Sequence, residues 1–577
     1  MKYKKIVSLV LSISLLASFT SFEGISSLGV SAEDDVVETT QETTTTDATT
    51  GEDTVPVELV NGQVPTSEDS FSFDGKGTIT DYKGTDTDVV IPKTIGGVKV
   101  TSIGTNCFRN DQSIRTVTIP NTVGKIAGAS GSSGAFGSSS VEEVIFEEGS
   151  TISGIDDYTF RGCTSLRSIT LPDGVLTISD MAFYECSSLI NINFPEGLSS
   201  IGKNAFGRCS SLKKVILPDS VESIGEYAFG ECSNLTTIKL SANLDSVPVQ
   251  CFVLCTSLTD VELPDSITSI GDYAFDRCSN LKSINVPCAV GDSAFKDCKN
   301  LITVDFSEGV TSIGKETFKG CTSLTGVSLP DTVVSLGEKA FYGCSNMATL
   351  KLSSNLNMIS EGCFYGGKAL TSVEIPASVK SIGIEAFRGC TSLKDITFNE
   401  GLVSICERAF LEDGAIDDVV IPNTTTSIGN SAFKDCKNIS TLKTTGKVSL
   451  GNSAFLGCSS LVKAELSAET TVGEKALGRN AYLFDIAVLM KNKGTIFTIY
   501  GYTGSSANKY AIDNKIPFVD VETDNFDENT VSKEDTTKPG DSTSTDVKKG
   551  DVNGDGKVNT ADLLVIKKYL LGLIDTL

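Results

Sequence analysis

Hydrophobic and polar positions recur along most of the chain with a period of 23 residues. Four consecutive segments read TISDMAFYECSSLININFPEGLS, SIGKNAFGRCSSLKKVILPDSVE, SIGEYAFGECSNLTTIKLSANLD and SVPVQCFVLCTSLTDVELPDSIT. They share the template S-I-G-x-x-A-F-x-x-C-x-S-L-x-x-I-x-L-P-x-x-V-x. Self-similarity at a fixed period is typical of folds in which similar units stack side by side. The pattern therefore predicts a repeat solenoid.

The second residue of the template marks each unit, and it occurs seventeen times, with twelve of the sixteen spacings equal to 23. These marker residues are Ile103, Ile126, Ile155, Ile178, Ile201, Ile224, Val247, Ile270, Val290, Ile313, Leu336, Ile359, Ile382, Ile405, Ile428, Leu450 and Val472.

Within one unit, the stretch SLKKVILP alternates as a short strand does. Val215 and Leu217 are expected to point inward, and Ile216 outward. Phe206 and Cys209 are three residues apart, so they share one side of a short helical or 3₁₀ turn. One such coil cannot enclose a core alone, and we expect stability to come from contacts between neighbouring coils.

The two ends of the chain differ in composition from the repeats. At the N-terminus three lysines precede the apolar run 6–16 and the small-residue site at 30–32, which is the pattern of a cleaved secretory signal. The next stretch carries eleven acidic residues and no Lys or Arg, so we expect it to be disordered. The predicted divisions are 1–32 signal peptide, 33–69 disordered acidic Thr-rich segment, 70–102 N-terminal cap, 103–520 solenoid with its C-terminal cap, 521–549 linker and 550–577 a C-terminal module.

The repeated I-G-x-x-A-F-x-x-C resembles the bacterial surface leucine-rich repeats of the BspA type, over about residues 71–520. The closing stretch GTIFTIYGYTGSSANKYAIDNKIPFVDV is similar to that family's C-terminal cap. The resemblance implies an elongated, β-rich leucine-rich repeat solenoid. It also implies a surface binding protein or adhesin, with a partner that varies among members.

Seventeen cysteines in an exported chain raise the possibility of disulfides. Their positions argue otherwise, because a residue repeated in every coil forms an inward row in which Cys acts as a small hydrophobe. Three further cysteines (Cys107, Cys251 and Cys363) replace the Ala before Phe, and Cys288 and Cys406 fit neither position. We expect reduced, buried thiols without a metal. The twelve cysteines of the inward row are Cys163, Cys186, Cys209, Cys232, Cys255, Cys278, Cys298, Cys321, Cys344, Cys390, Cys436 and Cys458.

Near the C-terminus, the segment GDVNGDGKVNTADLLVIKKYLLG has the spacing of a calcium-binding loop followed by a helix. Counting from Asp551, hard oxygen ligands fall at positions 1, 3, 5, 7, 9 and 12, and Gly556 at position 6 permits the sharp turn. The predicted calcium ligands are Asp551, Asn553, Asp555, Lys557 (through its carbonyl), Asn559 and Asp562.

This segment lacks a helix before the loop and has Asp at position 12, and in both respects it resembles a type I dockerin. The resemblance implies a small all-α module that binds calcium and docks onto a cohesin of a scaffold protein, as in cellulosomes. By the same resemblance, the cohesin-contacting residues are Thr560, Ala561, Lys567 and Lys568. Dockerins carry two loop–helix segments and this sequence shows one, so it is either a half-module or a truncated one.

The amino-acid composition excludes some classes of function. The chain has no His, which removes the usual general base, and no Trp. With a net charge of −25 and no basic face, nucleic acid is not an expected partner. The main hypothesis is a secreted, monomeric, non-catalytic protein, without a membrane span after signal cleavage. Its solenoid binds a protein or a glycan, and its tail docks onto cohesin.

Four alternatives remain open. The chain could be a surface adhesin without scaffold docking, a rod that acts only as a spacer, or an enzyme that works with two carboxylates. It could also be a protease inhibitor that acts through an exposed loop such as 127–140. The hypothesis of a binding surface rests on the outward strand positions, whose residue types vary from unit to unit. These are Asn193, Ile216, Lys239, Glu262, Asn285, Asp305, Ser328, Lys351, Glu374 and Thr397.

Overall fold

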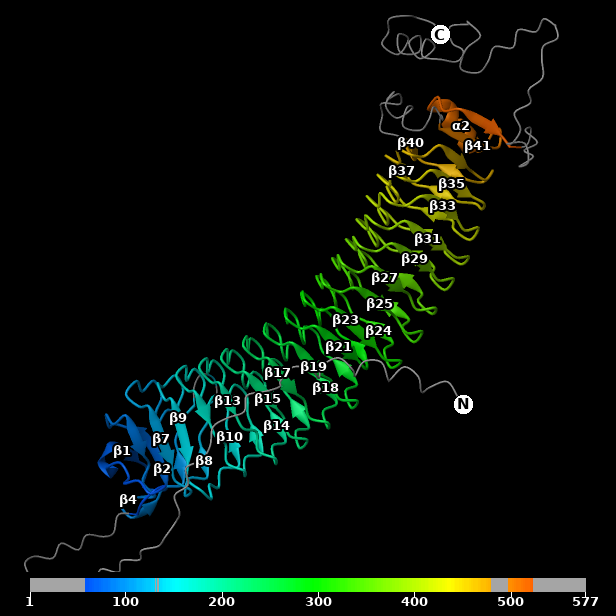
Figure 1. The fold of residues 1–577 in the computed structure, drawn as a ribbon. Helices are drawn as coiled ribbons and strands as arrows, with labels where there is room; N and C mark the ends of the chain where they lie inside the picture. The colour runs from blue at the N-terminus through cyan, green and yellow to red at the C-terminus, as the bar shows by residue number, and fades with distance from the viewer. Residues whose placement is uncertain (1–57, 130, 132–133, 479–496, 522–577) are drawn as a thin grey trace, which may run out of the picture. The chain divides into compact units, whose positions relative to one another are not determined.

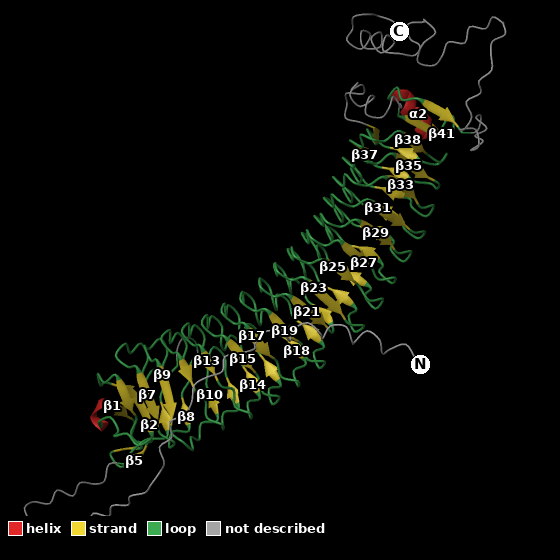
Figure 2. Cartoon of the chain, viewed as in Figure 1, coloured by secondary structure: helices red, strands yellow, loops and turns green. Residues whose placement is uncertain are grey.

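The computed structural model describes residues 58–129, 131, 134–478 and 497–521. They form a solenoid of stacked coils (Figure 1). Each coil contributes two short strands, and turns make up its other sides (Figure 2). The predicted fold, a β-rich leucine-rich repeat solenoid, is confirmed. Below, each coil is named by the number of its marker residue, so that coil 201 begins at the strand containing Ile201.

The first row of strands contains the marker residues. Its strands pair in parallel and in register, so that Ile155, Ile178 and Ile201 lie one above another. The markers from Ile103 to Leu450 are buried. The strands are β2 (Thr78–Tyr82), β6 (Ser102–Ile103), β8 (Lys125–Ile126), β10 (Gly154–Ile155), β12 (Thr177–Ile178), β14 (Ser200–Ile201), β16 (Ser223–Ile224), β18 (Ser246–Val247), β20 (Ser269–Ile270), β22 (Ala289–Val290), β24 (Ser312–Ile313), β26 (Ser335–Leu336), β28 (Met358–Ile359), β30 (Ser381–Ile382), β32 (Ser404–Ile405), β34 (Ser427–Ile428), β36 (Ser449–Leu450) and β39 (Thr471–Val472).

The second row follows the Cys-x-Ser-Leu turn. Val215 and Leu217 are buried here and Ile216 is exposed, as the alternation predicts. The strands are β3 (Asp88–Val90), β7 (Thr116–Ile119), β9 (Glu143–Phe146), β11 (Ser168–Ile169), β13 (Asn191–Ile192), β15 (Lys214–Ile216), β17 (Thr237–Lys239), β19 (Asp260–Glu262), β21 (Ser283–Val286), β23 (Thr303–Phe306), β25 (Gly326–Ser328), β27 (Thr349–Lys351), β29 (Ser372–Ile375), β31 (Asp395–Phe398), β33 (Asp418–Ile421), β35 (Thr441–Thr444), β38 (Lys463–Glu465), β41 (Thr498–Gly501) and β42 (Phe518–Asp520).

Both ends of the described stack depart from the template. At the N-terminal end, β2 adds a rung ahead of the first predicted marker, because Ile79 pairs with Ile103, and β1 (Phe71–Phe73) closes β2 as an antiparallel hairpin. At the C-terminal end, helix α2 (Ser506–Asp513) packs on β39 and β41. The remaining elements are the 3₁₀ helix η1 (Glu68–Ser70) and strands β4 (Thr94–Ile95), β5 (Val98–Lys99), β37 (Phe455–Leu456) and β40 (Leu477–Gly478).

A continuous column of phenylalanine rings runs through the interior. Phe206 and Phe229, for example, have ring centroids 5.3 Å apart and planes inclined by 3°. Offset stacking of this kind adds about 0.5–1.5 kcal/mol per pair beyond the burial of area. Tyr82 covers the first ring of the column. The column consists of Phe108, Phe136, Phe160, Phe183, Phe206, Phe229, Phe252, Phe275, Phe295, Phe318, Phe341, Phe364, Phe387, Phe410, Phe433 and Phe455.

The segment around each Phe is a chain of tight turns. In coil 201 the N–H of Cys209 donates to the carbonyl of Phe206, an i→i+3 bond of the kind that a 3₁₀ turn makes. Two residues in left-handed conformation, Asn204 (φ 55°) and Arg208 (φ 62°), prevent these turns from continuing as a helix. The same two positions are left-handed in most coils, and the second is often glycine, as at Gly343 (φ 74°).

These left-handed residues turn alternate N–H groups toward the next coil. The N–H groups of Asn204, Phe206 and Arg208 donate to the carbonyls of Glu226, Ala228 and Gly230, at 2.8–2.9 Å. The turn segment therefore forms a third hydrogen-bonded ladder between coils, in addition to the two rows of strands. Its backbone polar groups are satisfied although it is neither helix nor strand.

We expect Phe295→Ala to lower the free energy of unfolding by about 3–5 kcal/mol, because it leaves a gap in the middle of the ring column. Urea unfolding of the full chain, followed by circular dichroism, measures the effect. Asn285→Ala, on the exposed side of the preceding coil, is the control and should change stability by less than about 0.5 kcal/mol. Equal unfolding midpoints for the two variants would show that the column is not a main source of stability.

Candidate functional site

The outward positions of the second strand row form an exposed surface along the solenoid. All ten outward residues predicted from the sequence are exposed. Where the strands pair, they pair in register, as Ser328 with Lys351, so the outward side chains of neighbouring coils lie one above another within each sheet. The strands fix the spacing of the row while its chemistry changes from coil to coil, which suits a binding surface built on a constant scaffold.

A groove of about 440 Å³ crosses this surface over strands β23, β25 and β27. Its floor is Gly326, the one outward position there without a side chain. A Cβ on Gly326 would lie 2.2 Å from Oγ1 of Thr349, so the neighbouring threonine already occupies the space that a side chain would take. Strands β23 and β25 also fall in separate hydrogen-bonded sheets. The groove therefore lies where the second row passes from one hydrogen-bonded sheet to the next, as this row also does between β13 and β15, β27 and β29, and β31 and β33.

The polar side chains around the groove are largely unused within the described residues. Thr303, Ser328 and Thr349 make no hydrogen bond there through their hydroxyls, and neither Asp305 nor Lys351 forms an ion pair. Asp305 and Lys351 lie on opposite sides of Ser328, two coils apart. The groove thus offers one carboxylate, one ammonium group and several hydroxyls to an external polar ligand.

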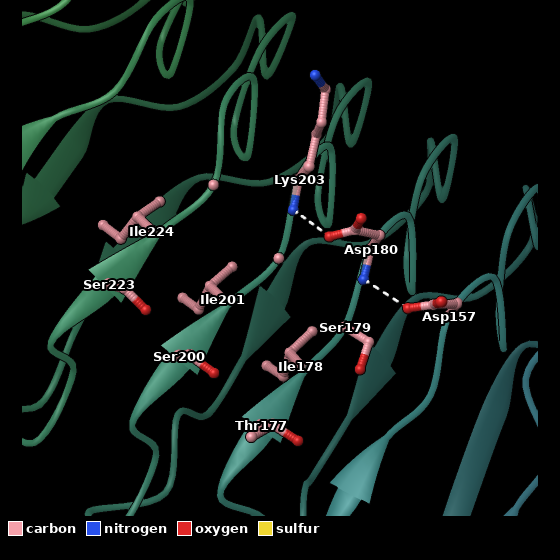
Figure 3. A pocket seen from close by; sticks show the side chains of 12 residues that line it. Asp157, Thr177, Ile178, Ser179, Asp180, Ser200, Ile201, Lys203, Ser223 and Ile224 are labelled. Atoms are coloured by element: carbon pink, nitrogen blue, oxygen red, sulfur yellow. Dashed lines mark hydrogen bonds between the residues drawn. The ribbon is translucent and has the colours of Figure 1, made fainter.

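A second hollow, of about 570 Å³, lies along the first strand row at coils 178, 201 and 224 (Figure 3). Two aspartates on its rim are engaged by the backbone of the following coil. The N–H of Asp180 donates to Oδ1 of Asp157 (3.0 Å), and the N–H of Lys203 donates to Oδ1 of Asp180 (2.7 Å). These carboxylates tie one coil to the next. The hollow arises because Gly202 and Gly225 must be glycines, since a Cβ on either would lie within 2.6 Å of backbone atoms.

The described residues contain no cluster of three or more Cys, Asp, Glu or His side chains able to hold a metal ion. We therefore interpret the hollow in Figure 3 as part of the repeat architecture. The groove over Gly326 is the better candidate for a ligand site, because most of its polar side chains are not engaged in holding the coils together; the hydroxyl of Thr325, which donates to the carbonyl of Ile302 (3.2 Å), is an exception.

The cysteines lie where the sequence predicts, and the structure gives them a further role. All seventeen are free thiols, and all but Cys406 are buried. Each of the twelve cysteines in the inward row donates its S–H to the carbonyl of the Phe in the preceding coil, as Cys232 does to Phe206, at 3.0–3.3 Å. The row is thus a ladder of hydrogen bonds between coils. Burial raises the pKa of these thiols, as at Cys209, so they remain protonated donors.

The predicted calcium and cohesin-contacting residues lie outside the described residues. This holds for the six ligands from Asp551 to Asp562 and for Thr560, Ala561, Lys567 and Lys568. The predicted signal peptide, the acidic segment up to residue 57 and the linker from 522 onward also fall there. These predictions therefore depend on sequence alone. Among the described helices, none is long and apolar enough to span a bilayer.

Comparison with known families identifies both parts of the chain. The model of the BspA type leucine rich repeat region, with six copies, matches in overlapping blocks that together extend from residue 87 to 483. The chain belongs to the BspA-type leucine-rich repeat family. The model of the dockerin type I domain matches residues 522–575, so this BspA-type protein carries a dockerin-like segment after its solenoid. That match begins inside the stretch predicted as a linker, and the boundary at 549/550 stays a prediction.

Several bacterial leucine-rich repeat proteins are among the solved structures similar to this BspA-type chain. One, from Bacteroides ovatus, is 24% identical, covers 69% of this chain and 93% of its own, and has a TM-score of 0.49. A leucine rich cell surface protein from Faecalibacterium prausnitzii is 25% identical, with coverages of 64% and 90% and a TM-score of 0.34. A protein from T. pallidum is 27% identical, with coverages of 41% and 90% and a TM-score of 0.26. No curated protein matches the chain.

We expect all seventeen thiols to react in denatured, unreduced protein, because each ladder cysteine is engaged with a carbonyl and not with another sulfur. Titration with a thiol reagent, against a pre-reduced aliquot as control, measures the number. In native protein the half-buried Cys406 should react first and the ladder thiols slowly. A titre of only one or two thiols would contradict the reduced ladder.

Proposed function

We propose that this BspA-type protein is a secreted, non-catalytic binding protein. Its C-terminal segment docks onto a cohesin of a cellulosome-type scaffold, and its solenoid presents an extended surface to a protein or glycan. The observation that carries the proposal is the presence, in one chain, of a repeat solenoid with a regular exposed face and a segment that matches the dockerin type I domain at 522–575. Neither matched family is described by a catalytic activity.

The donor set of the C-terminal loop suits calcium. Asp551, Asn553, Asp555 and Asp562 offer hard carboxylate and amide oxygens, and Lys557 contributes its backbone carbonyl. Bound calcium would draw these four side chains together and so order the loop ahead of the helix. A short segment has little apolar core of its own, so the ion would supply much of the folding free energy. Thr560, Ala561, Lys567 and Lys568 would then be held in position to contact the cohesin.

The solenoid's part of the proposal rests on the outward face and on the groove over Gly326. A ligand there would exchange hydrogen bonds with the hydroxyls of Thr303 and Thr349. It would also meet the charges of Asp305 and Lys351. Polar and charged groups of this kind select a partner by complementarity more than by buried area. The rest of the face supplies the rigid spacing.

We expect the full chain to bind at least one member of an immobilised cohesin panel in calcium and to be released by EDTA. The double substitution Asp551→Ala with Asp555→Ala should abolish this binding, because it removes two of the charged ligands. Asp546→Ala, five residues before the loop, is the matched control and should bind normally. Binding that persists in EDTA, or wild-type protein that binds no cohesin, would favour a surface adhesin without scaffold docking.

We expect Ser328→Arg to weaken binding to the solenoid's ligand by at least about tenfold, because the new side chain fills the groove. Ser328 is exposed, so the core is unaffected. Thr397→Arg, at the same strand position three coils further on, is the control. A glycan array probed with the full chain provides the measurement. If the chain binds nothing on the array, glycans are excluded as the class of ligand. If both variants bind equally well, the groove is excluded as the binding site.

A further inference from the structure

The ladder of buried thiols is interrupted inside the solenoid at two coils. Between Cys163 and Cys458, the Cys position is taken by Gly367 in coil 359 and by Asp413 in coil 405. Cys390 lies between them, so its two neighbours in the row are a residue without a side chain and a carboxyl group. Because Gly367 has no side chain, the ladder lacks one hydrogen bond at that coil. The aspartate is a larger change, because it brings an ionisable group into an apolar column.

Asp413 occupies its position with the same backbone geometry as the cysteines. Its N–H donates to the carbonyl of Phe410, as the N–H of Cys209 does to Phe206. The residue has no exposed surface, and within the described residues neither carboxyl oxygen has a hydrogen-bond partner. In the coils that carry a cysteine at this position, its thiol donates to the carbonyl of the Phe in the preceding coil, which here is Phe387. Among the described residues, that carbonyl accepts only from the N–H of Cys390 (3.0 Å).

The titratable groups around Asp413 provide no counter-charge. They are the thiol of Cys390 in the preceding coil, the thiol of Cys436 in the following coil and the carboxylate of Glu412 in its own turn. Arg388 of the preceding coil pairs instead with Glu385 and Glu412. Burial raises the pKa of Asp413 well above its usual range, and it outweighs the nearby backbone N–H groups of Cys390 and Gly389, which act in the opposite direction.

The two protonation states fit this position differently. A protonated carboxyl can donate its O–H to a carbonyl, as the thiol does, and can stay buried. A carboxylate has no hydrogen to donate to a carbonyl, and a buried, unpaired charge is strongly unfavourable. The ionised form thus favours any conformation in which water reaches the side chain.

We propose that Asp413 makes coils 382, 405 and 428 a pH-sensitive weak point of the solenoid, closed while the carboxyl is protonated and opening locally once it ionises. Each coil contacts only its neighbours, so a few coils can open while the others stay folded. The folded-state pKa is raised above the unfolded value of about 3.9, so the protonated carboxyl stabilises the closed state fully below about pH 4. That stabilisation decreases as the pH rises toward the folded-state pKa.

The ladder itself provides the probe for local opening. We would label the native full chain with iodoacetamide at several pH values between about 6 and 9, and quantify each cysteine by peptide mass spectrometry. Dividing the rates of Cys390 and Cys436 by those of Cys209 and Cys232, in an uninterrupted part of the row, removes the pH dependence common to all thiols. We expect this ratio to exceed one and to rise with pH, by up to about tenfold per unit.

Three variants complete the test. Asp413→Asn keeps the shape without the charge and should flatten the pH dependence of the ratio. Asp413→Cys restores the repeat and should bring the ratio close to one at every pH. Asp435→Asn removes an acid from the turn of the next coil. Because Asp435 adjoins Cys436 and acts on its thiol, this variant is assessed at Cys390, whose ratio should keep its wild-type pH dependence. A flat ratio in the wild type, or a pH dependence that persists in Asp413→Asn or Asp413→Cys, would overturn the proposal.

Discussion

The structure depends on one constraint: a coil of about 23 residues has no interior of its own and is closed only by the coils above and below it. Every regular feature serves that closure. Two rows of parallel strands, the ladder of turn N–H groups, the thiol–carbonyl bonds and the column of phenylalanine rings all run from coil to coil. Because four kinds of contact repeat with the same period, a coil can lack one of them, as coil 359 lacks its thiol at Gly367, and still occupy its place.

The sequence predicts much of this architecture because its repeat shows directly which positions face inward. The markers, the inward cysteines and the alternation in SLKKVILP all follow from the template, and the structure confirms them. The two left-handed positions in the turn were not predicted, because residues as different as Asn204, Tyr227 and Glu316 occupy the first of them. A signal existed at the second, where glycine precedes Cys321, Cys344 and Cys390. The spacing of Phe and Cys predicts a helical or 3₁₀ turn in that stretch, and the structure has i→i+3 turns separated by the left-handed residues.

The candidate sites were less predictable than the fold, since each depends on residues that differ from coil to coil. Asp413 departs from the template at the Cys position, whereas Gly326 falls at a variable position, and sequence alone does not show whether either residue matters. Their neighbours in the adjacent coils decide it: unused hydroxyls around Gly326, and thiols without a counter-charge around Asp413. For the C-terminal loop the spacing from Asp551 to Asp562 and the family match remain the whole basis of the prediction.

The turn ladder gives the stack a direction. In every pair of coils that it joins, donors belong to the earlier coil and acceptors to the later one, as Phe206 donates to Ala228 and Phe229 to Cys251. During synthesis, a completed coil would hold a row of unpaired amide hydrogens ready for the carbonyls of the residues emerging next. A nascent chain could then be templated from its N-terminal end, one layer at a time, without waiting for distant parts of the sequence.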